Sequence, residues 1–394
     1  MSALLISLSP ALKRLRDEGY NLEIRAGYLL VKDIPYVDAG RKVQRGILVS
    51  KLDLAGDVAT KPESHVAYFI GSHPCQTDGK EIERIKNASA DNTLAEGLVV
   101  NHTFSAKPKP KGSYDDYYEK VATYVDILSG PAQAISPGVT AKTFAPSVPD
   151  EKDPSVFKYI DTASSRAEII VVTQKLAVPK IAIVGLGGTG SYVLDLVAKT
   201  PVKEIHLFDG DEFLQHNAFR APGAPSIETL TEKPRKTAYF KDIYSKMRHG
   251  IIDHEAYATK ENVEQLRDMS FVFLCMEGGA AKKLIVEKLE EFGVLFVEVG
   301  LGVDHTDDAL GGIVRVTTST PEKRDHLRKR VSWSNDETDN QYDENIQIAD
   351  LNALNAVLAV IRWKKLCGFY RDLDREHNST YTIDGNTLNN EDQQ

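Results

Sequence analysis

Cysteine is scarce in this sequence, with three residues at positions 75, 275 and 367. Cysteines this far apart build no disulfide framework, and without C-x-x-C spacing they form no cysteine-rich zinc site. Long apolar runs are also missing, since stretches such as Ile169–Val172 fall far short of the ~20 residues that a membrane span needs. Residues 1–10 lack the basic start and the cleavage site of a secretion signal. These absences predict a cytoplasmic protein without a membrane partner.

Positive charge is in deficit, because 48 lysines and arginines face 57 aspartates and glutamates, giving a formal net charge of −9. A surface with this bias repels the phosphate backbone of DNA and RNA, so we expect no nucleic-acid partner. Hydrophobic residues at 42% and charged residues at 27% form an ordinary globular balance, which excludes a wholly disordered chain and a coiled-coil rod. A chain of 394 residues is long enough for two domains.

Residues 1–150 are predicted to form the smaller domain, an α+β unit that ends in a proline-rich linker. A short helix is expected after Ser9-Pro10, because serine caps a helix and proline fits its first turn. Turn residues then separate runs that have the apolar pattern of strands, at 22–25, 28–34, 47–54 and 65–70. Residues 114–128 carry apolar side chains at helical spacing. These patterns assign the domain no role.

Residues 151–384 have a different pattern, in which apolar strands alternate with helices. The expected strands are 180–184, 204–208, 271–275 and 294–299, and the helices include 190–199 and 280–292. Such alternation is typical of an α/β fold with a Rossmann-like, doubly wound and mostly parallel sheet. A long helix is expected over 346–365, and the last residues, 385–394, are interpreted as a polar tail.

A glycine-rich segment directly follows the first of these strands and opens a helix. Gly185, Gly187 and Gly190 fit the pattern G-x-G-x-x-G, in which glycines permit a tight turn and a close approach of the backbone to a phosphate. The helix N-terminus adds N–H donors and partial positive charge for an anion. Asp209 ends the next strand, where a carboxylate can accept the ribose hydroxyls. This context predicts nucleotide binding.

The segment that begins at Asp209 distinguishes one nucleotide-binding family from the others. It has D-G-D at 209–211, N-A-F-R at 217–220 and a lysine at 236 that opens a helix. Together with the glycine loop, this set resembles the ubiquitin-activating-enzyme superfamily, including the bacterial ThiF/MoeB-type adenylating enzymes, over residues 155–370. The resemblance implies an enzyme that uses ATP and Mg²⁺ to join AMP to the C-terminal carboxylate of a ubiquitin-like or sulfur-carrier protein. The lack of a zinc-binding cysteine set favours conjugation over sulfur transfer.

The resemblance also implies roles for single residues. The reacting phosphate would be oriented by Asn217 and stabilised by Arg220 and Lys236, since cations fixed in advance stabilise the developing charge. Arg166 would reach the phosphates bound by a partner subunit, which implies a homodimer. The alternative is that Arg166 is an ordinary helix arginine without a role in the site. The nucleotide would be held by the glycine loop and the polar residues around it: Gly185, Gly187, Gly188, Gly190, Asp209, Asp211 and Lys233.

Two departures from the family pattern limit what the resemblance implies. Glu277 stands where the family has an aspartate that engages Mg²⁺ and the transition state, so this carboxylate is one methylene longer. The loop 319–347, where ubiquitin-activating enzymes carry an acyl-accepting cysteine, contains none. The activated carboxylate would then pass directly to another protein, such as a carrier resembling a conjugating enzyme, or form an oxyester on a serine, or reach Cys75. The candidate serines are Ser319, Ser332 and Ser334.

Two alternative functions stay open. An NAD(P)-dependent oxidoreductase would share the glycine loop and Asp209, but it does not explain Asn217, Arg220 and Lys236. A catalytically inactive adenylation scaffold would explain Glu277 and the missing cysteine. The single residues have structural alternatives too, because Arg220 could form a surface ion pair and Asn217 could cap a helix.

Overall fold

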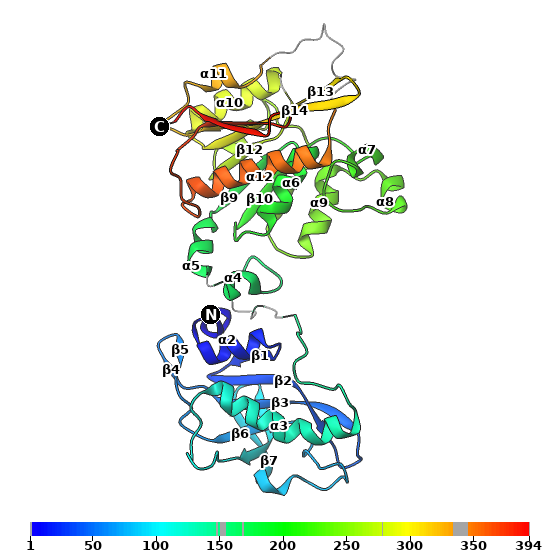
Figure 1. Ribbon diagram of the computed structural model, residues 1–394, viewed down its shortest axis with the longest axis vertical. Coiled ribbons are helices and arrows are strands. Elements are labelled where there is room, and N and C mark those ends of the chain that lie inside the picture. The colour runs from blue at the N-terminus through cyan, green and yellow to red at the C-terminus, as the bar shows by residue number, and fades with distance from the viewer. Residues whose placement is uncertain are drawn as a thin grey trace. The chain divides into compact units, whose positions relative to one another are not determined.

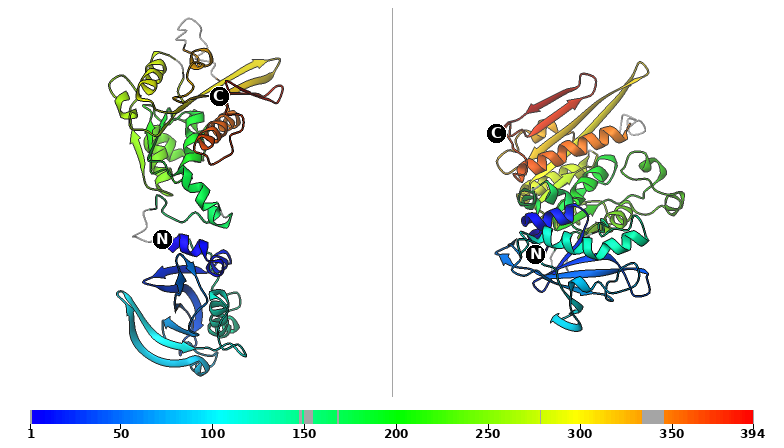
Figure 2. Two further views of the ribbon diagram at one scale, coloured as in Figure 1. Left: turned by 90° about the vertical axis from the view of Figure 1, so that its left-hand side faces the viewer. Right: turned by 60° about the horizontal axis from the view of Figure 1, so that its bottom comes forward.

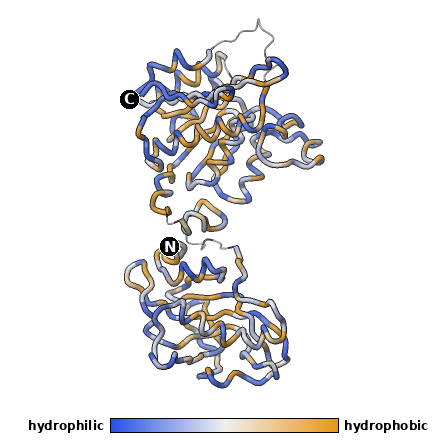
Figure 3. Tube along the Cα trace, in the orientation of Figure 1, coloured by the Kyte–Doolittle hydropathy of each residue, from blue (hydrophilic) through white to orange (hydrophobic). Residues whose placement is uncertain are grey.

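The computed structural model describes residues 2–146, 149, 155–167, 169–277, 279–333 and 346–393. The chain divides into two compact units (Figure 1). The first comprises Met1–Pro154 with Tyr159–Ala167, and the second comprises Ser155–Lys158 with Glu168–Gln394. Apolar positions gather inside each unit (Figure 3), so each has a hydrophobic core of its own. Among the described residues, no helix is both long and apolar enough to cross a membrane.

The N-terminal unit is built around an antiparallel sheet of six strands in the order β1-β2-β3-β6-β8-β7. These strands are β1 (Asn21–Arg25), β2 (Tyr28–Val37), β3 (Val43–Lys51), β6 (Val66–Ile70), β7 (Lys86–Ala95) and β8 (Leu98–Ser105). The smaller elements are the strand pair β4 (Leu54–Ala55) and β5 (Val58–Ala59) and the 3-10 turn η1 (Glu83–Ile85). The helices are α1 (Ser2–Leu8), α2 (Pro10–Asp17), α3 (Tyr117–Ile135) and α4 (Thr162–Arg166). Helices and an antiparallel sheet therefore make up this unit, and the sequence patterns missed the hairpin β7–β8.

Helix α3 packs on β2 and fills much of the core of this unit. Asp116 caps the start of the helix by accepting a hydrogen bond from a backbone N–H in the first turn, at 2.8 Å. Tyr117 and Tyr124 are fully buried, and their hydroxyls donate to the main-chain oxygens of Lys51 at 2.8 Å and His65 at 2.6 Å. The phenol groups are thus satisfied inside the core, and the helix is fastened to the sheet.

The C-terminal unit contains an eight-stranded sheet in the order β11-β10-β9-β12-β13-β14-β15-β16. The strands of its C-terminal end can be followed in yellow and red in Figure 2. Its parallel strands are β9 (Lys180–Val184), β10 (Glu204–Phe208), β11 (Ile251–His254), β12 (Phe271–Leu274) and β13 (Phe296–Thr306). The antiparallel strands β14 (Ala309–Ser319), β15 (Asn378–Thr382) and β16 (Thr387–Glu391) extend it. The predicted Rossmann-like, mostly parallel sheet is confirmed, and the structure adds the antiparallel extension.

The helices of this unit connect or cover the strands. They are α5 (Ile170–Thr173), α6 (Gly188–Ala198), α7 (Gln215–Ala218), α8 (Ile227–Glu232), α9 (Lys236–Ser245), α10 (Ala280–Phe292), α11 (Leu327–Arg330) and α12 (Ala349–Leu366), with 3-10 turns η2 (Gln174–Leu176) and η3 (Val263–Leu266). Helix α12 packs against α6 and against β13 and β14. Residues far apart in the sequence, on α6 and α12, therefore meet beside the sheet.

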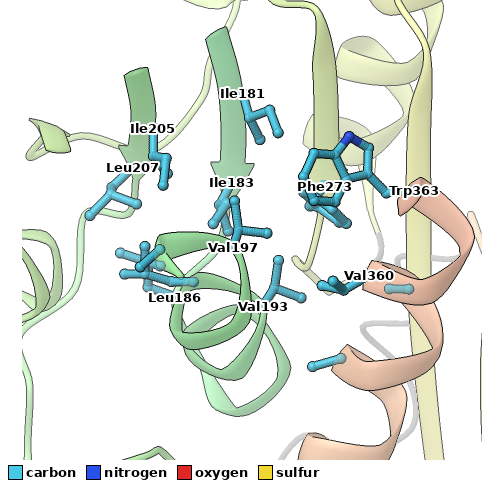
Figure 4. Close-up of a cluster of buried hydrophobic side chains, with 14 of the residues drawn as sticks. Ile181, Ile183, Leu186, Val193, Val197, Ile205, Leu207, Phe273, Val360 and Trp363 are labelled. Carbon is cyan, nitrogen blue, oxygen red and sulfur yellow. The ribbon is translucent and has the colours of Figure 1, made fainter. Parts of the chain in front are cut away.

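The main core of this unit forms where α6 and α12 meet the sheet (Figure 4). Ile181 and Ile183 of β9 and Ile205 of β10 are fully buried in this core. Because alternate residues of a strand point to one face, Ile181 and Ile183 lie on the same face of the sheet. Trp363 of α12 is 1% exposed, and its ring centroid lies 6.1 Å from that of Phe273 in β12. This packing fixes the carboxyl ends of the central strands relative to the start of α6, where the glycine loop lies.

The end of the chain is more ordered than its polar composition suggested. Residues 385–394, interpreted from the sequence as a polar tail, contain β16, which pairs with β15. Arg330 forms ion pairs with Glu391 and Asp392, both at 2.8 Å. The main-chain hydrogen bonds of an edge strand need no apolar side chains, so hydropathy alone gives no sign of such a strand.

Candidate functional site

A cavity of about 770 Å³ opens at the carboxyl ends of β9, β10 and β12. Open α/β sheets bind ligands outside these ends, at the point where the strand order reverses. The sheet order places β9 between β10 and β12, so the glycine loop that follows β9 lies in the middle of this edge. The cavity continues along β13 and β14, where Gly300, Gly302 and Arg315 line it. Its volume is within the range of roughly 300–1,000 Å³ that is usual for small-molecule sites.

The four predicted glycines of the loop all line or support this cavity, for different reasons. Gly185 has a φ of +90°, which side-chain-bearing residues rarely adopt. A Cβ on Gly190 would lie 1.9 Å from the Gly185 carbonyl oxygen, and one on Gly188 would lie 2.2 Å from Nδ2 of Asn352. Within the described part of the chain, and apart from its immediate neighbours in sequence, no atom lies within 4 Å of where a Cβ on Gly187 would be. The backbone at Gly187 is therefore open to a ligand, as a phosphate-binding loop requires.

Asp209, at the end of β10, holds the glycine loop and the following turn together. Its carboxylate accepts hydrogen bonds from the backbone N–H groups of Leu186 at 2.7 Å and Asp211 at 2.8 Å. The side chain is 6% exposed and lines the cavity. Because each carboxylate oxygen has a second lone pair, Asp209 can still accept ribose hydroxyls, and that role stays a prediction.

Lys236 opens α9 inside the cavity and is held there by carboxylates. Its Nζ lies 2.6 Å from Oδ2 of Asp211 and 3.8 Å from Oδ2 of Asp209. The hydroxyl of Tyr257 also donates to Asp211, and this hydrogen bond raises the pKa of Tyr257 to about 12. Burial acts to raise the pKa of Asp211, but the hydrogen bonds from Lys236 and Tyr257 outweigh it and lower the pKa. Asp211 is therefore ionised at neutral pH and keeps the lysine in place.

Arg220 brings a second cation to the cavity wall. Burial lowers the pKa of its guanidinium, and the charges of Glu277 and Asp211 act in the opposite direction. Its Nε is buried and has no hydrogen-bond partner within the described part of the chain. A guanidinium with an unused donor is well suited to an incoming phosphate, because its N–H groups match phosphate oxygens in a fork.

Lys233 and Asn217 are not among the described residues that line the cavity. Lys233 follows α8 in the left-handed conformation, with a φ of +47°. Asn217 is 3% exposed, and its Oδ1 accepts the backbone N–H of Leu214 at 2.8 Å, so the residue caps α7. Arg166 ends α4, which is grouped with the N-terminal unit. Lys236 thus lines the cavity and Lys233 does not, and Asn217 makes a helix-capping hydrogen bond. The functional roles expected of these residues stay predictions.

Glu277 follows β12 and lines the cavity, as its predicted role requires. Its Oε1 lies 3.4 Å from Nε2 of Gln347. No cluster of three or more histidine, cysteine, aspartate or glutamate side chains suited to a metal ion occurs among the described residues. Mg²⁺ needs no such cluster, because it usually binds through one or two carboxylates together with substrate phosphates and water. The carboxylate of Glu277, in the same cavity as the glycine loop, is chemically suitable for that role.

The candidate acyl acceptors have different environments. Ser332 is exposed and lines the cavity. Ser319 ends β14 and is fully buried, and it is not among the lining residues, which is unfavourable for a group that must meet a substrate. Ser334 lies outside the described residues. Cys75 is 1% exposed, and burial raises the pKa of its thiol, so it lacks the access and the thiolate that an acceptor needs.

Sequence reasoning missed a charge cluster around a buried glutamate of β13, in the lining of the same cavity. Glu298 of β13 is fully buried and lies 2.7 Å from Nζ of Lys282 and 2.9 Å from Nη2 of Arg315. It also missed Asn352 and Asn355, two buried amides of α12 that line the cavity. The asparagines were detectable, because they interrupt the apolar face of the predicted helix. Glu298 had no such signal, since its partners are distant in sequence.

Comparisons with known proteins follow the same division of the chain. Residues 10–162 match a family described as a domain of unknown function (DUF6791), and residues 164–390 match the ThiF family. No curated protein matches the chain.

Several solved structures are similar to part of the chain. E. coli MccB in complex with AMPCPP and MccA has 17% identity over 59% of this chain and 71% of that chain, with a TM-score of 0.47. PaaA has 17% identity over 56% of this chain and 75% of that chain, with a TM-score of 0.43. E. coli tRNA N6-threonylcarbamoyladenosine dehydratase, TcdA, in complex with AMP has 18% identity over 52% of this chain and 93% of that chain, with a TM-score of 0.40.

The ThiF match covers more than half of the chain and includes the whole cavity wall described above. Within it lie the glycine loop, the two cations Arg220 and Lys236, and the carboxylate of Glu277. The sequence resemblance, the sheet order and the family match therefore agree. This chain belongs to the ThiF family, a family of adenylating enzymes.

Proposed function

We propose that this chain uses ATP and Mg²⁺ to adenylate the C-terminal carboxylate of a ubiquitin-like or sulfur-carrier protein. One observation carries the proposal: the glycine loop, Arg220 and Lys236 line a single cavity at the carboxyl ends of β9, β10 and β12. Neither cation is needed to hold a dinucleotide, so the oxidoreductase alternative leaves them unexplained. An adenylation site does need such cations, because ATP and the substrate carboxylate are both anions and must come together.

The reaction is a displacement at the α-phosphorus of ATP. An oxygen of the substrate carboxylate forms a bond to that phosphorus, and the bond to the β-phosphate oxygen breaks. Pyrophosphate leaves with that electron pair, and the product is an acyl-adenylate. Negative charge develops on the α-phosphate oxygens, and fixed donors aimed at them stabilise it. Arg220 would supply forked N–H donors, and Lys236 would supply a point charge that Asp211 holds in position.

Mg²⁺ would neutralise part of the phosphate charge when bound. Among the described residues, Glu277 is our candidate for holding it, directly or through water, because its carboxylate lines the same cavity. Glutamate in place of the family aspartate moves the ligand oxygen by about one methylene, which a site with water between the protein and the metal can absorb.

The acyl group would leave the adenylate without a cysteine of this chain. Burial raises the pKa of Cys275 and raises that of Cys367 to about 11, so neither thiol is ionised at neutral pH. We propose direct transfer to an acceptor, which includes a carrier resembling a conjugating enzyme, or an oxyester on Ser332, the candidate serine that lines the cavity. We also propose a homodimer, in which Arg166 completes the partner's site.

Thermal unfolding of the full chain tests the nucleotide site. A ligand that binds only the folded state stabilises it by about 2.7 kcal/mol at a concentration of 100 Kd. We expect ATP with Mg²⁺ to raise the melting temperature and NAD⁺ or NADP⁺ to leave it unchanged. A shift with NAD⁺ or NADP⁺ alone would contradict the proposal and favour an oxidoreductase. No shift with any of them would favour an inactive scaffold.

A further inference from the structure

Helix α12 presents a buried carboxamide to the cavity wall. Asn352 is 1% exposed and lines the cavity. Its Oδ1 accepts a hydrogen bond from the hydroxyl of Thr189 at 3.0 Å. Its Nδ2 is buried and donates to no group in the part of the chain that the structure describes. Since buried polar groups are normally hydrogen-bonded, an amide donor left over at a ligand cavity needs an explanation.

The position of this carboxamide relates it to the phosphate loop. A Cβ at Gly188 would lie 2.2 Å from Nδ2 and 2.5 Å from Oδ1 of Asn352, so the amide rests directly on the backbone there. Gly188 is the first residue of α6, an eleven-residue helix. The N-terminus of such a helix favours an anion, because its first N–H groups are not used within the helix. The unused amide donor thus lies where a phosphate is expected.

Thr189 determines which end of the carboxamide is used. Its hydroxyl occupies Oδ1, and this leaves the two N–H groups of Nδ2 as the available donors. Because Asn352 and Thr189 belong to α12 and α6, which pack against each other, the amide is oriented before any ligand arrives. A donor that is fixed in advance and unsatisfied in the free protein gains its hydrogen bond only in the complex.

We propose that Asn352 is a further ATP-binding residue, with Nδ2 donating to an oxygen of the phosphate that the glycine loop holds. This inference rests on the proposed function, because it requires a nucleotide at that loop. It adds a residue of α12 to the predicted nucleotide-binding residues that line the cavity, which lie between Gly185 and Glu277 in the sequence. Thr189 is the positioning residue, since it acts through the carboxamide.

Calorimetric titration of the full chain with ATP and Mg²⁺ tests the assignment. Asn352→Leu keeps the approximate shape and removes the donor, so we expect affinity to fall roughly 10- to 100-fold, the usual effect of losing a hydrogen bond to a charged group. Asn352→Asp puts a carboxylate beside the phosphate and should weaken binding at least as much. Thr189→Val leaves the amide but frees its orientation, so the loss should be smaller.

Asn378 supplies a matched control. It is also 1% exposed, and its Oδ1 accepts the hydroxyl of Thr317 at 2.9 Å, but it does not line the cavity. Asn378→Leu should therefore leave ATP affinity unchanged. Equal ATP affinity in wild type and Asn352→Leu would overturn the inference, and so would an equal loss in Asn378→Leu. If Asn352→Leu does not fold, Asn352→Asp and Thr189→Val decide. A wild-type chain that binds no ATP would instead defeat the proposed function itself.

Discussion

Each unit of the molecule buries a lysine, and the two lysines have different surroundings. Lys120 of α3 is 2% exposed, and its Nζ donates to the hydroxyl of Ser50 and the main-chain oxygen of Ser64, both at 2.8 Å. Lys236 of α9 is 5% exposed, but its Nζ lies against the carboxylate of Asp211 in a cavity. Burial lowers the pKa of Lys120 to about 8, because its partners are neutral.

The surroundings of a buried cation indicate whether it belongs to a functional site. Neutral partners satisfy the hydrogen bonds of an ammonium group but leave its charge uncompensated, and such a lysine serves packing. Carboxylate partners pair with the ammonium group, and a neighbouring cavity gives an anion access to it. Burial alone therefore does not separate Lys120 from Lys236, whereas the chemistry of the partners and the cavity does.

We expect the greatest loss of stability at Glu298, a single carboxylate that pairs with two cations, Lys282 and Arg315. Glu298→Gln would leave the buried Lys282 and the half-buried Arg315 without their carboxylate, and breaking a buried ion pair such as Lys282–Glu298 costs about 3–5 kcal/mol. Urea unfolding of the full chain measures the loss. Glu264→Gln is the matched control, because its ion pair with Arg267 at 2.7 Å is exposed and should contribute less than about 1 kcal/mol. Equal losses would show that Glu298 is not the electrostatic centre of this wall.

The next effect is a pH dependence of stability that follows from the burial of Lys120 among neutral partners. Its pKa is about 8 in the folded chain against an ordinary value of 10.5, so the unfolded chain binds the proton more tightly between these values. Stability linked to Lys120 should therefore rise from pH 8 to 10.5 and be lost as the pH falls through 8, with a full extent of about 3 kcal/mol. The measurement is the difference in unfolding free energy between wild type and Lys120→Met at pH 8 and pH 10. A difference that does not change with pH would contradict the comparison.

Lys236→Met tests the carboxylate-held lysine through ligand binding. The substitution removes a cation and leaves the carboxylates of Asp209 and Asp211 facing the phosphates, so ATP affinity should fall roughly 10- to 100-fold. Calorimetry with ATP and Mg²⁺ gives the affinity. Lys241→Met is the control, because Lys241 lies on the same helix and pairs with Asp253 outside the cavity. The ATP affinity of Lys241→Met should equal that of the wild type. A similar loss of ATP affinity in Lys241→Met and Lys236→Met would indicate that the substitutions disrupt α9 itself.

The parts of the site that sequence could predict are local. The strand, turn and helix around Gly185–Gly190 follow one another directly, so the phosphate loop and the end of β10 at Asp209 were recognisable from spacing. Lys236 was preferred over Lys233 because it opens a helix, and the cavity lining agrees. Asn217 had two local interpretations, orientation of the phosphate and capping of a helix, and the structure shows a capping hydrogen bond.

The parts that sequence could not predict depend on contacts between distant segments. Glu298 meets residues of α10 and β14, and no spacing rule links these elements. Strand β7 is exposed along most of its length, and β16 is polar, so neither has the apolar alternation by which strands are recognised. Each of these strands is held by main-chain hydrogen bonds to a neighbouring strand, and the hydropathy of the sequence gives no sign of such pairing.

We expect the least change from a substitution of Lys233, the lysine that does not line the cavity. Lys233 has left-handed φ and ψ values of 47° and 57° after α8, a conformation that favours glycine. Lys233→Gly should therefore leave ATP affinity unchanged and stabilise the chain by up to about 1 kcal/mol, seen as a slightly higher urea midpoint. A tenfold loss of ATP affinity in Lys233→Gly, with Lys236→Met unaffected, would exchange the roles of the two lysines. It would also show that the carboxylates around Lys236 hold a structural cation, as the serines do for Lys120.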